Sequence, residues 1–384
     1  MSATIEGREE RKGHHLEAAD VIRVLATIAV LGVHVTGPDV RMTTTYDVAW
    51  WSLASLESLS IWAVPGFVML SGALLLPRPN SGARGSFYRR RFAKIGIPLI
   101  VWFAAHTIWL HLDLPQIDPY STQWYLDIGL LKNVAAGQAS WHLYFLFLIA
   151  GLYLATPYVR MVLQSISPRE ELWLVLGLFA LSCTCHIANT LLGQGGLNIA
   201  TQWLPYVCYF VAGHYIVTHA TWRASHFFWL AVFGLAASLT CKYIEMRIFD
   251  GNLAVVLGGY SSSYFSIAIA VYSVAMVGWI LRFGQTRGFP PAVLKVCRVL
   301  APATFGVFLM QLMVWTLLRE TLGLVEIPKN AWQGGQVIVA VGGTSLLLTY
   351  AIGLIPIVRT IVDCNTQAVW TSLRSDDEAN SDQG

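Results

Sequence analysis

Residues 20–34 read DVIRVLATIAVLGVH, an apolar run of helical length that carries an acid, a base and an imidazole. At about 100° per residue, the step from Arg23 to His34 leaves a net rotation of about 20° and a rise of about 16 Å, so both project from one face. Asp20, Thr27 and His34 recur every seven residues and share that stripe. Ionisable groups inside a spanning segment cost at least about 2.5–3.5 kcal/mol each and by default mark a functional site. We interpret Arg23 and His34 as a functional pair, because the alternative, Arg23 reaching the membrane surface and His34 bonded to a neighbouring helix, explains Arg23 better than His34.

The composition places the chain among polytopic membrane proteins. Apolar residues make up 55% and charged residues only 12%, whereas soluble proteins have about 25% charged residues. The net charge of +3 is small and the basic residues are dispersed, which excludes nucleic acid as a partner. The six cysteines are scattered. Cys183, Cys185 and His186 lack a second pair of ligands, so we predict no metal site.

The hydropathy pattern predicts an all-α fold with about ten transmembrane helices, each near the roughly 20 residues that a bilayer requires. The spans are expected at 20–37, 51–76, 95–112, 142–160, 171–192, 199–217, 226–244, 262–281, 300–321 and 334–356.

The distribution of basic residues predicts the orientation. Of the 25 Lys and Arg, eighteen fall on the N-terminal side of this arrangement and one, Arg23, lies within the first span. By the positive-inside rule, both termini are cytoplasmic. We therefore expect a cytoplasmic tail at 1–17, a membrane domain at 18–357 and a partly disordered cytoplasmic tail at 358–384. The remaining six basic residues fall on the far side: Arg41, Lys132, Lys242, Arg247, Arg319 and Lys329.

The longest external connection, residues 113–140, is rich in aromatic and acidic side chains, including Asp118, Trp124 and Tyr125. This mixture suits the stacking and hydrogen bonding of a sugar. An aromatic belt at the membrane surface is the alternative interpretation.

Four stretches together resemble acyltransferase family 3, a family of membrane O-acyltransferases. The first is the spacing of Arg23 and His34, preceded by Asp20, and the resemblance extends over residues 18–357. The last of the four closely resembles the subgroup that includes the enterobacterial common antigen O-acetyltransferase and the acyltransferases of exopolysaccharide operons. The other three stretches are VPGFVMLSGALL at 64–75, FYRRRFAKIGIP at 87–98 and WHLYFLFLIAGLYLATP at 141–157.

The resemblance implies transfer of an acyl group, acetyl or succinyl, from cytoplasmic acyl-CoA to a hydroxyl of an extracytoplasmic polysaccharide or lipid-linked sugar. It implies a multi-pass protein of the bacterial cytoplasmic (inner) membrane that uses acyl-CoA as donor substrate without a bound cofactor. The bilayer and a polysaccharide synthase complex are further expected partners.

The chain departs from the family in three places. A frequent Arg-x-x-Arg pair is here Arg91 and Lys94, which keeps the charge but loses one planar fork. His142 stands where one branch of the family has a glutamate. Gln311 stands where many members carry a histidine, and an amide cannot shuttle protons.

The chemistry of the residues fits this activity. A neutral imidazole such as His34 can take the proton of a hydroxyl or hold an acyl group, so we expect His34, with Arg23 and Asp20, to be catalytic. CoA is polyanionic, and Arg23, Arg91 and Lys94 are expected to bind it near the cytoplasm. The basic run that contains Arg91 and Lys94 is equally explained as a topology signal with anionic lipid contacts. Further groups expected to support the site are Glu57, Ser71 and His142.

Two other functions stay open. A non-catalytic polysaccharide exporter or flippase is compatible with the number of spans. Such a transporter is expected to have broken helices at matched positions in two halves, whereas here the polar residues concentrate in the first four spans. Gln311 also leaves open an inactive member of the family.

Overall fold

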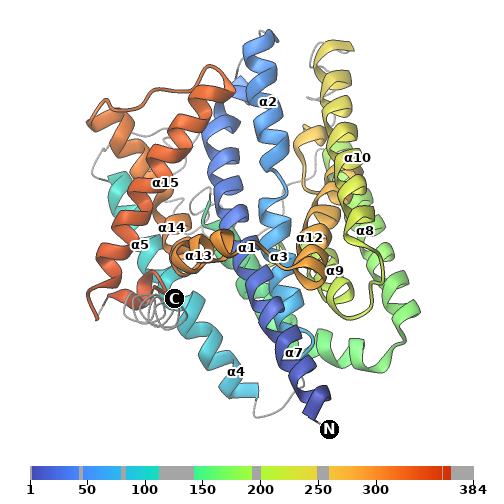
Figure 1. The fold of residues 1–384 in the computed structure, drawn as a ribbon. Helices are drawn as coiled ribbons and strands as arrows, with labels where there is room; N and C mark the ends of the chain where they lie inside the picture. The colour runs from blue at the N-terminus through green and yellow to red at the C-terminus, as the bar shows by residue number, and fades with distance from the viewer. Residues whose placement is uncertain are drawn as a thin grey trace.

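The computed structural model describes residues 2–42, 46–78, 84–111, 142–192, 200–248, 259–356 and 358–364. Every regular element in these ranges is helical (Figure 1), which confirms the predicted all-α class. The α-helices are α1 Ser2–Met42, α2 Val48–Ser60, α3 Ala63–Leu75, α4 Arg84–Arg91, α5 Ile97–His111, α7 Tyr144–Ser165, α8 Pro168–Leu191, α9 Val207–Thr218, α10 Ala224–Tyr243, α12 Ile267–Arg287, α13 Pro291–Leu300, α14 Thr304–Thr316 and α15 Ala331–Gly353. Five-residue π-helices cover Phe92–Gly96, Ile244–Ile248 and Leu317–Thr321. Short 3₁₀ turns cover Leu204–Tyr206, Tyr260–Ser262, Ala301–Ala303 and Arg359–Ile361.

Nine helical stretches of the described residues are long and apolar enough to cross a membrane. The expected span at 199–217 corresponds to a shorter apolar helix, Leu204–Thr218. Most of α9 is buried inside the bundle, including Cys208, Tyr209 and Phe210. Other helices therefore surround α9, and it does not need the length of a helix that faces lipid across the whole bilayer. A count of ten spans stays a prediction. The external connection 113–140 and the last residues of the chain lie outside the described residues.

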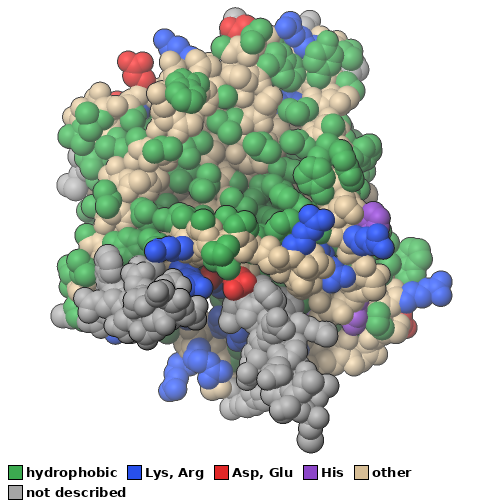
Figure 2. Space-filling model, in the orientation of Figure 1, with side chains coloured by type: hydrophobic (Ala, Val, Ile, Leu, Met, Phe, Trp, Pro, Cys, Tyr) green, Lys and Arg blue, Asp and Glu red, His purple; other side chains and the backbone are tan. Residues whose placement is uncertain are grey.

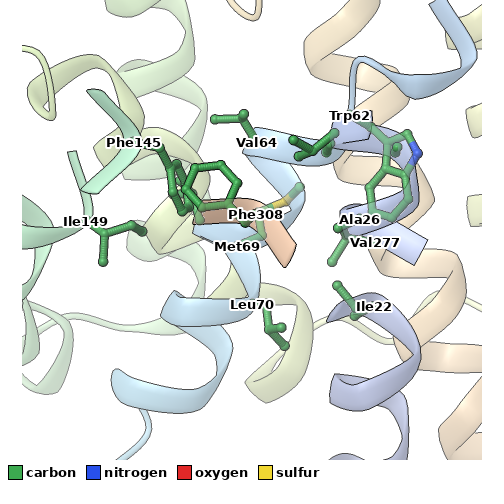
Figure 3. Close-up of a cluster of buried hydrophobic side chains, with 14 of the residues drawn as sticks. Ile22, Ala26, Trp62, Val64, Met69, Leu70, Phe145, Ile149, Val277 and Phe308 are labelled. Carbon is green, nitrogen blue, oxygen red and sulfur yellow. The ribbon is translucent and has the colours of Figure 1, made fainter. Parts of the chain in front are cut away.

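Helix α1 runs through the centre of the bundle (Figure 1) and contacts α2, α3, α12, α14 and α15. It has 41 residues and is longer than the predicted span at 20–37, because the polar segment before Glu17 continues the same helix. Its apolar face is buried: Ile22 and Ala26 belong to one cluster with Trp62 and Val277 (Figure 3). This burial fixes the stripe that carries Arg23 and His34 against the rest of the bundle.

The expected second span consists of two helices, α2 and α3, separated at Ile61 and Trp62. Proline has no backbone N–H, so Pro65 cannot donate a helical hydrogen bond to the carbonyl of Ile61. The helix restarts where the N–H of Gly66 donates to the Trp62 carbonyl at 2.7 Å. The break separates the polar helix α2, which carries Glu57, from α3, which carries Ser71.

Helices α3 and α9 cross at two glycines. A side chain on Gly72 would collide with the backbone carbonyl of Phe210, and one on Gly213 would collide with that of Met69. Small residues allow membrane helices to approach this closely and pack by van der Waals contact. The two glycines therefore allow α9 to support α3 at backbone contact.

The surface agrees with a spanning orientation. Figure 2 shows a band of hydrophobic side chains across one face, with Lys and Arg gathered below it and fewer above. The lower end is where α1 begins in the same orientation (Figure 1). This asymmetry supports the predicted cytoplasmic N-terminus, which stays a prediction because no bilayer is present.

Candidate functional site

The stripe of α1 begins with an ion pair. Arg23 Nη1 donates to Asp20 Oδ1 at 2.5 Å, one helical turn apart. The hydroxyl of Thr27 donates to the carbonyl of Arg23 at 2.8 Å. The side chains of Arg23 and Asp20 are 38% and 34% exposed. Because a guanidinium has five N–H donors, Arg23 keeps donors for an anion as well as its bond to Asp20.

Three imidazoles meet inside the bundle, and we call them the histidine cluster: His34 of α1, His106 of α5 and His142 just before α7. The ring centroids of His34 and His142 lie 6.3 Å apart, edge to face. Those of His106 and His142 lie 4.7 Å apart. His106 and His142 are buried, whereas His34 is partly exposed. The structure thus brings together the predicted residues His34 and His142 and adds a third histidine.

A single backbone carbonyl organises two of these rings. Nε2 of His106 and Nε2 of His142 each lie 3.3 Å from the carbonyl oxygen of Leu309 in α14. A carbonyl oxygen only accepts hydrogen bonds, so both rings direct Nε2–H at it. In a neutral imidazole the other nitrogen, Nδ1, then carries the lone pair. His106 and His142 therefore share the same tautomer, with the proton on Nε2.

At the other end of the stripe, predicted residues gather around Tyr153 of α7. The guanidinium carbon of Arg91 lies 5.2 Å from the centroid of the Tyr153 ring. Ser71 and Arg23 also lie near Tyr153. Phe87 supports Arg91 from its own helix, 5.5 Å from ring centroid to guanidinium carbon. Arg23, Ser71 and Arg91 therefore belong to one region.

Arg160 extends this cationic end. It is buried, and its Nε and Nη2 donate to the carbonyl of Leu75 at 3.0 and 2.6 Å. Its guanidinium carbon also lies 5.3 Å from the centroid of the Phe87 ring. Lys94 is more peripheral, since its Nζ pairs with Asp363 at 3.0 Å and both side chains are about half exposed. The end of the bundle nearest the start of α1 thus gathers several cations.

Glu57 lies in a different environment from the one that we expected. Its Oε2 pairs with Nζ of Lys242 in α10 at 2.7 Å, and both side chains are 1% exposed. A buried ion pair of this kind joins α2 to α10. A supporting role for Glu57 toward His34 or the acceptor stays a prediction.

Sequence reasoning overlooked His106, Tyr153 and Arg160. His106 lies inside an apolar helix, so the rule that drew attention to His34, an ionisable residue within a span, also applies to it. Arg160 follows the same rule at the end of α7. Tyr153 carries no such signal, because tyrosine is common in membrane helices. Among the described residues, no group of three His, Cys, Asp or Glu side chains is arranged to hold a metal ion.

Comparison with known proteins gives one match. The sequence profile of an acyltransferase domain family, acyltransferase family 3, matches residues 16–354. Neither the curated proteins nor the solved structures contain a match. The profile covers both the histidine cluster and the cationic end.

Proposed function

The chain belongs to acyltransferase family 3, and from that premise we propose that it moves an acyl group, acetyl or succinyl, from cytoplasmic acyl-CoA to a hydroxyl of an extracytoplasmic or lipid-linked polysaccharide. Family membership supports a membrane acyltransferase. The donor, the acyl group, the acceptor and the location in the bacterial inner membrane are our proposal. The observation that carries it is the contact between His142 and His34 inside the bundle. His34 lies on α1, the helix that also carries Arg23.

The cationic end is suited to the donor. CoA carries several phosphate charges on a long arm, and arginine binds phosphate through paired N–H donors. Arg91 lies over the ring of Tyr153 and Arg23 lies near the same residue, which would let a ligand with several phosphates approach both guanidinium groups. The phosphates would remain at this end while the arm carried the thioester about 16 Å along α1 toward His34.

The histidine cluster is suited to the transfer. As the acceptor oxygen attacks the thioester carbonyl, its proton passes to the imidazole of His34. The carbon–sulfur bond breaks, the acceptor becomes an ester, and the sulfur of CoA takes the proton. A positioned base of this kind contributes about 10²–10⁴-fold in rate. His142 packs edge to face against His34, which would restrict the rotation of its ring.

The proposal is tested by acyl transfer in membrane vesicles. The acceptor is a glycolipid and polysaccharide extract from a strain that lacks the gene, and the donor is radiolabelled acetyl-CoA or succinyl-CoA. We expect wild type to label the extract, and His34→Ala and His34→Gln to lose at least about 10²-fold in rate at normal protein levels. His226→Gln, at an exposed histidine of α10, is the matched control and should retain activity. Wild-type labelling by His34→Gln would show that the imidazole is structural.

The proposed orientation has a separate test. Both termini are placed in the cytoplasm, so Asn330 at the start of α15 should be external. A cysteine at this position in a variant without the native cysteines should react with a membrane-impermeant maleimide from outside. Labelling only after the membrane is opened would show that this position is cytoplasmic and that the proposed orientation is wrong.

A further inference from the structure

Two buried polar atoms of α14 have no hydrogen-bond partner among the described residues. They are Oε1 of Gln311 and Nε1 of Trp315, whose side chains are 1% and 2% exposed. The amide nitrogen of Gln311 has a partner, since one N–H of Nε2 donates to the carbonyl of Phe308 at 3.2 Å. One unmet acceptor and one unmet donor therefore lie one helical turn apart. Leaving buried polar groups unpaired costs free energy, so native proteins rarely keep them without a purpose.

These atoms belong to the face of α14 that meets the histidine cluster. Phe308, Gln311 and Trp315 follow the spacing of one helical stripe. The ring of Phe308 lies 5.9 Å from that of His142 and 5.3 Å from that of Phe145, beside which it appears in Figure 3. The stripe of α14 thus starts at Phe308, which contacts His142, and continues to the two groups without a partner, on Gln311 and Trp315.

The direction of α14 places them on the side away from the cationic end. Helix α13 and the turn that follows it pack against α1, and Cys297, in the last turn of α13, lies near Asp20 at the start of the α1 stripe. Leu309 lies at the level of His142, which contacts His34 farther along α1. The chain from α13 into α14 therefore runs parallel to α1. Gln311 and Trp315 follow Leu309 and lie beyond the histidines, opposite Arg23.

We propose that Gln311 and Trp315 bind the acceptor, a polyhydroxylated molecule such as a sugar. Oε1 of Gln311 accepts a hydrogen bond from one hydroxyl, and the indole N–H of Trp315 donates to another hydroxyl or ring oxygen. A hydroxyl both donates and accepts, which matches the two unmet groups. Their spacing of about 6 Å along the helix means that they contact different oxygens of one ligand. This inference rests on the proposed function and identifies how its acceptor is held.

Thermal stability gives the first test and does not depend on any substrate. Trp50 is the matched control, because it is also 2% exposed but its Nε1 donates to the carbonyl of Val40 at 3.3 Å. Trp50→Phe and Trp315→Phe delete the same atoms. We expect the melting temperature of the ligand-free protein to fall further for Trp50→Phe. An equal or larger fall for Trp315→Phe would mean that its N–H has a structural partner and would overturn the proposal.

Acceptor kinetics give the second test. In the vesicle assay with the glycolipid and polysaccharide extract, Gln311→Met and Trp315→Phe should each raise the apparent KM for the extract about three- to ten-fold, the effect of one lost hydrogen bond. The KM for acetyl-CoA should stay within about two-fold, because the donor binds at the other end. Trp50→Phe should leave both values unchanged.

The outcomes separate this inference from the function on which it rests. If His34→Ala abolishes labelling but Gln311→Met and Trp315→Phe keep the wild-type KM, the two groups hold a buried water only and the acceptor proposal fails. If wild type labels no extract, the proposed function fails. The comparison of Trp315→Phe with Trp50→Phe then still decides whether the N–H of Trp315 is unpartnered.

Discussion

Lys242→Met tests the ion pair between α2 and α10. Nζ of Lys242 and Oε2 of Glu57 lie 2.7 Å apart, and each side chain is 1% exposed. The substitution removes the buried ammonium group that lies against the Glu57 carboxylate. Breaking a buried pair by removing one member costs about 3–5 kcal/mol, which corresponds to a rise of about 10²- to 10⁴-fold in the unfolding constant. The double variant Glu57→Leu/Lys242→Met removes both charges and should be close to wild type or more stable.

Both variants can be measured by reversible unfolding in mixed detergent micelles, followed by tryptophan fluorescence. A Lys242→Met protein within about 1 kcal/mol of wild type, or a double variant as unstable as the single one, would refute this reasoning. Acyl transfer by the double variant also decides the role of Glu57. Full activity would make the pair purely structural, and lost activity in a stable protein would support the predicted link to His34 or the acceptor.

Three further predictions concern the donor, the histidine cluster and the helix crossing. Arg91→Ala should raise the KM for acyl-CoA, and the difference from wild type should shrink at high salt, because phosphate contacts are screened. His106→Phe should lower kcat and shift the pH–rate profile, whereas His106→Gln retains an N–H for the Leu309 carbonyl and should restore much of both. Gly213→Val should destabilise the protein because the new side chain of α9 would collide with the Met69 carbonyl of α3, and Gly177→Ala, with open space beside it, should not.

Hydropathy predicted most of the fold because each span must satisfy its backbone internally. It missed the division between α2 and α3, although Pro65 gives a local signal for it. It also predicted a full-length span at 199–217, where the structure has the shorter helix Leu204–Thr218. Whether a helix is surrounded by protein depends on its neighbours, and the crossing of Gly72 with Phe210 is a tertiary contact that periodicity in one segment does not reveal.

For the candidate site, the cost of polar groups in a membrane pointed to Arg23 and His34, and the family resemblance pointed to the stretch that contains His142. Their roles stay predictions. Sequence reasoning did not identify His106, although the same argument applies, because none of the four family-like stretches contains that residue. The partner of Glu57 was beyond prediction, since 185 positions separate it from Lys242. Only the packing of α2 against α10 brings the two charges together.

The π-helix Phe92–Gly96 has a consequence for how this protein family can vary. It lies directly between Arg91 and the membrane helix α5, and each of its turns holds one residue more than an α-helical turn. Losing a single residue there would convert the wide turn into an ordinary one without rotating the flanking segments. Arg91 and His106 would keep their relative phase. Relatives are therefore expected to tolerate a one-residue gap at this point in an alignment, whereas the same gap within α1 would turn Arg23 and His34 away from each other by about 100°.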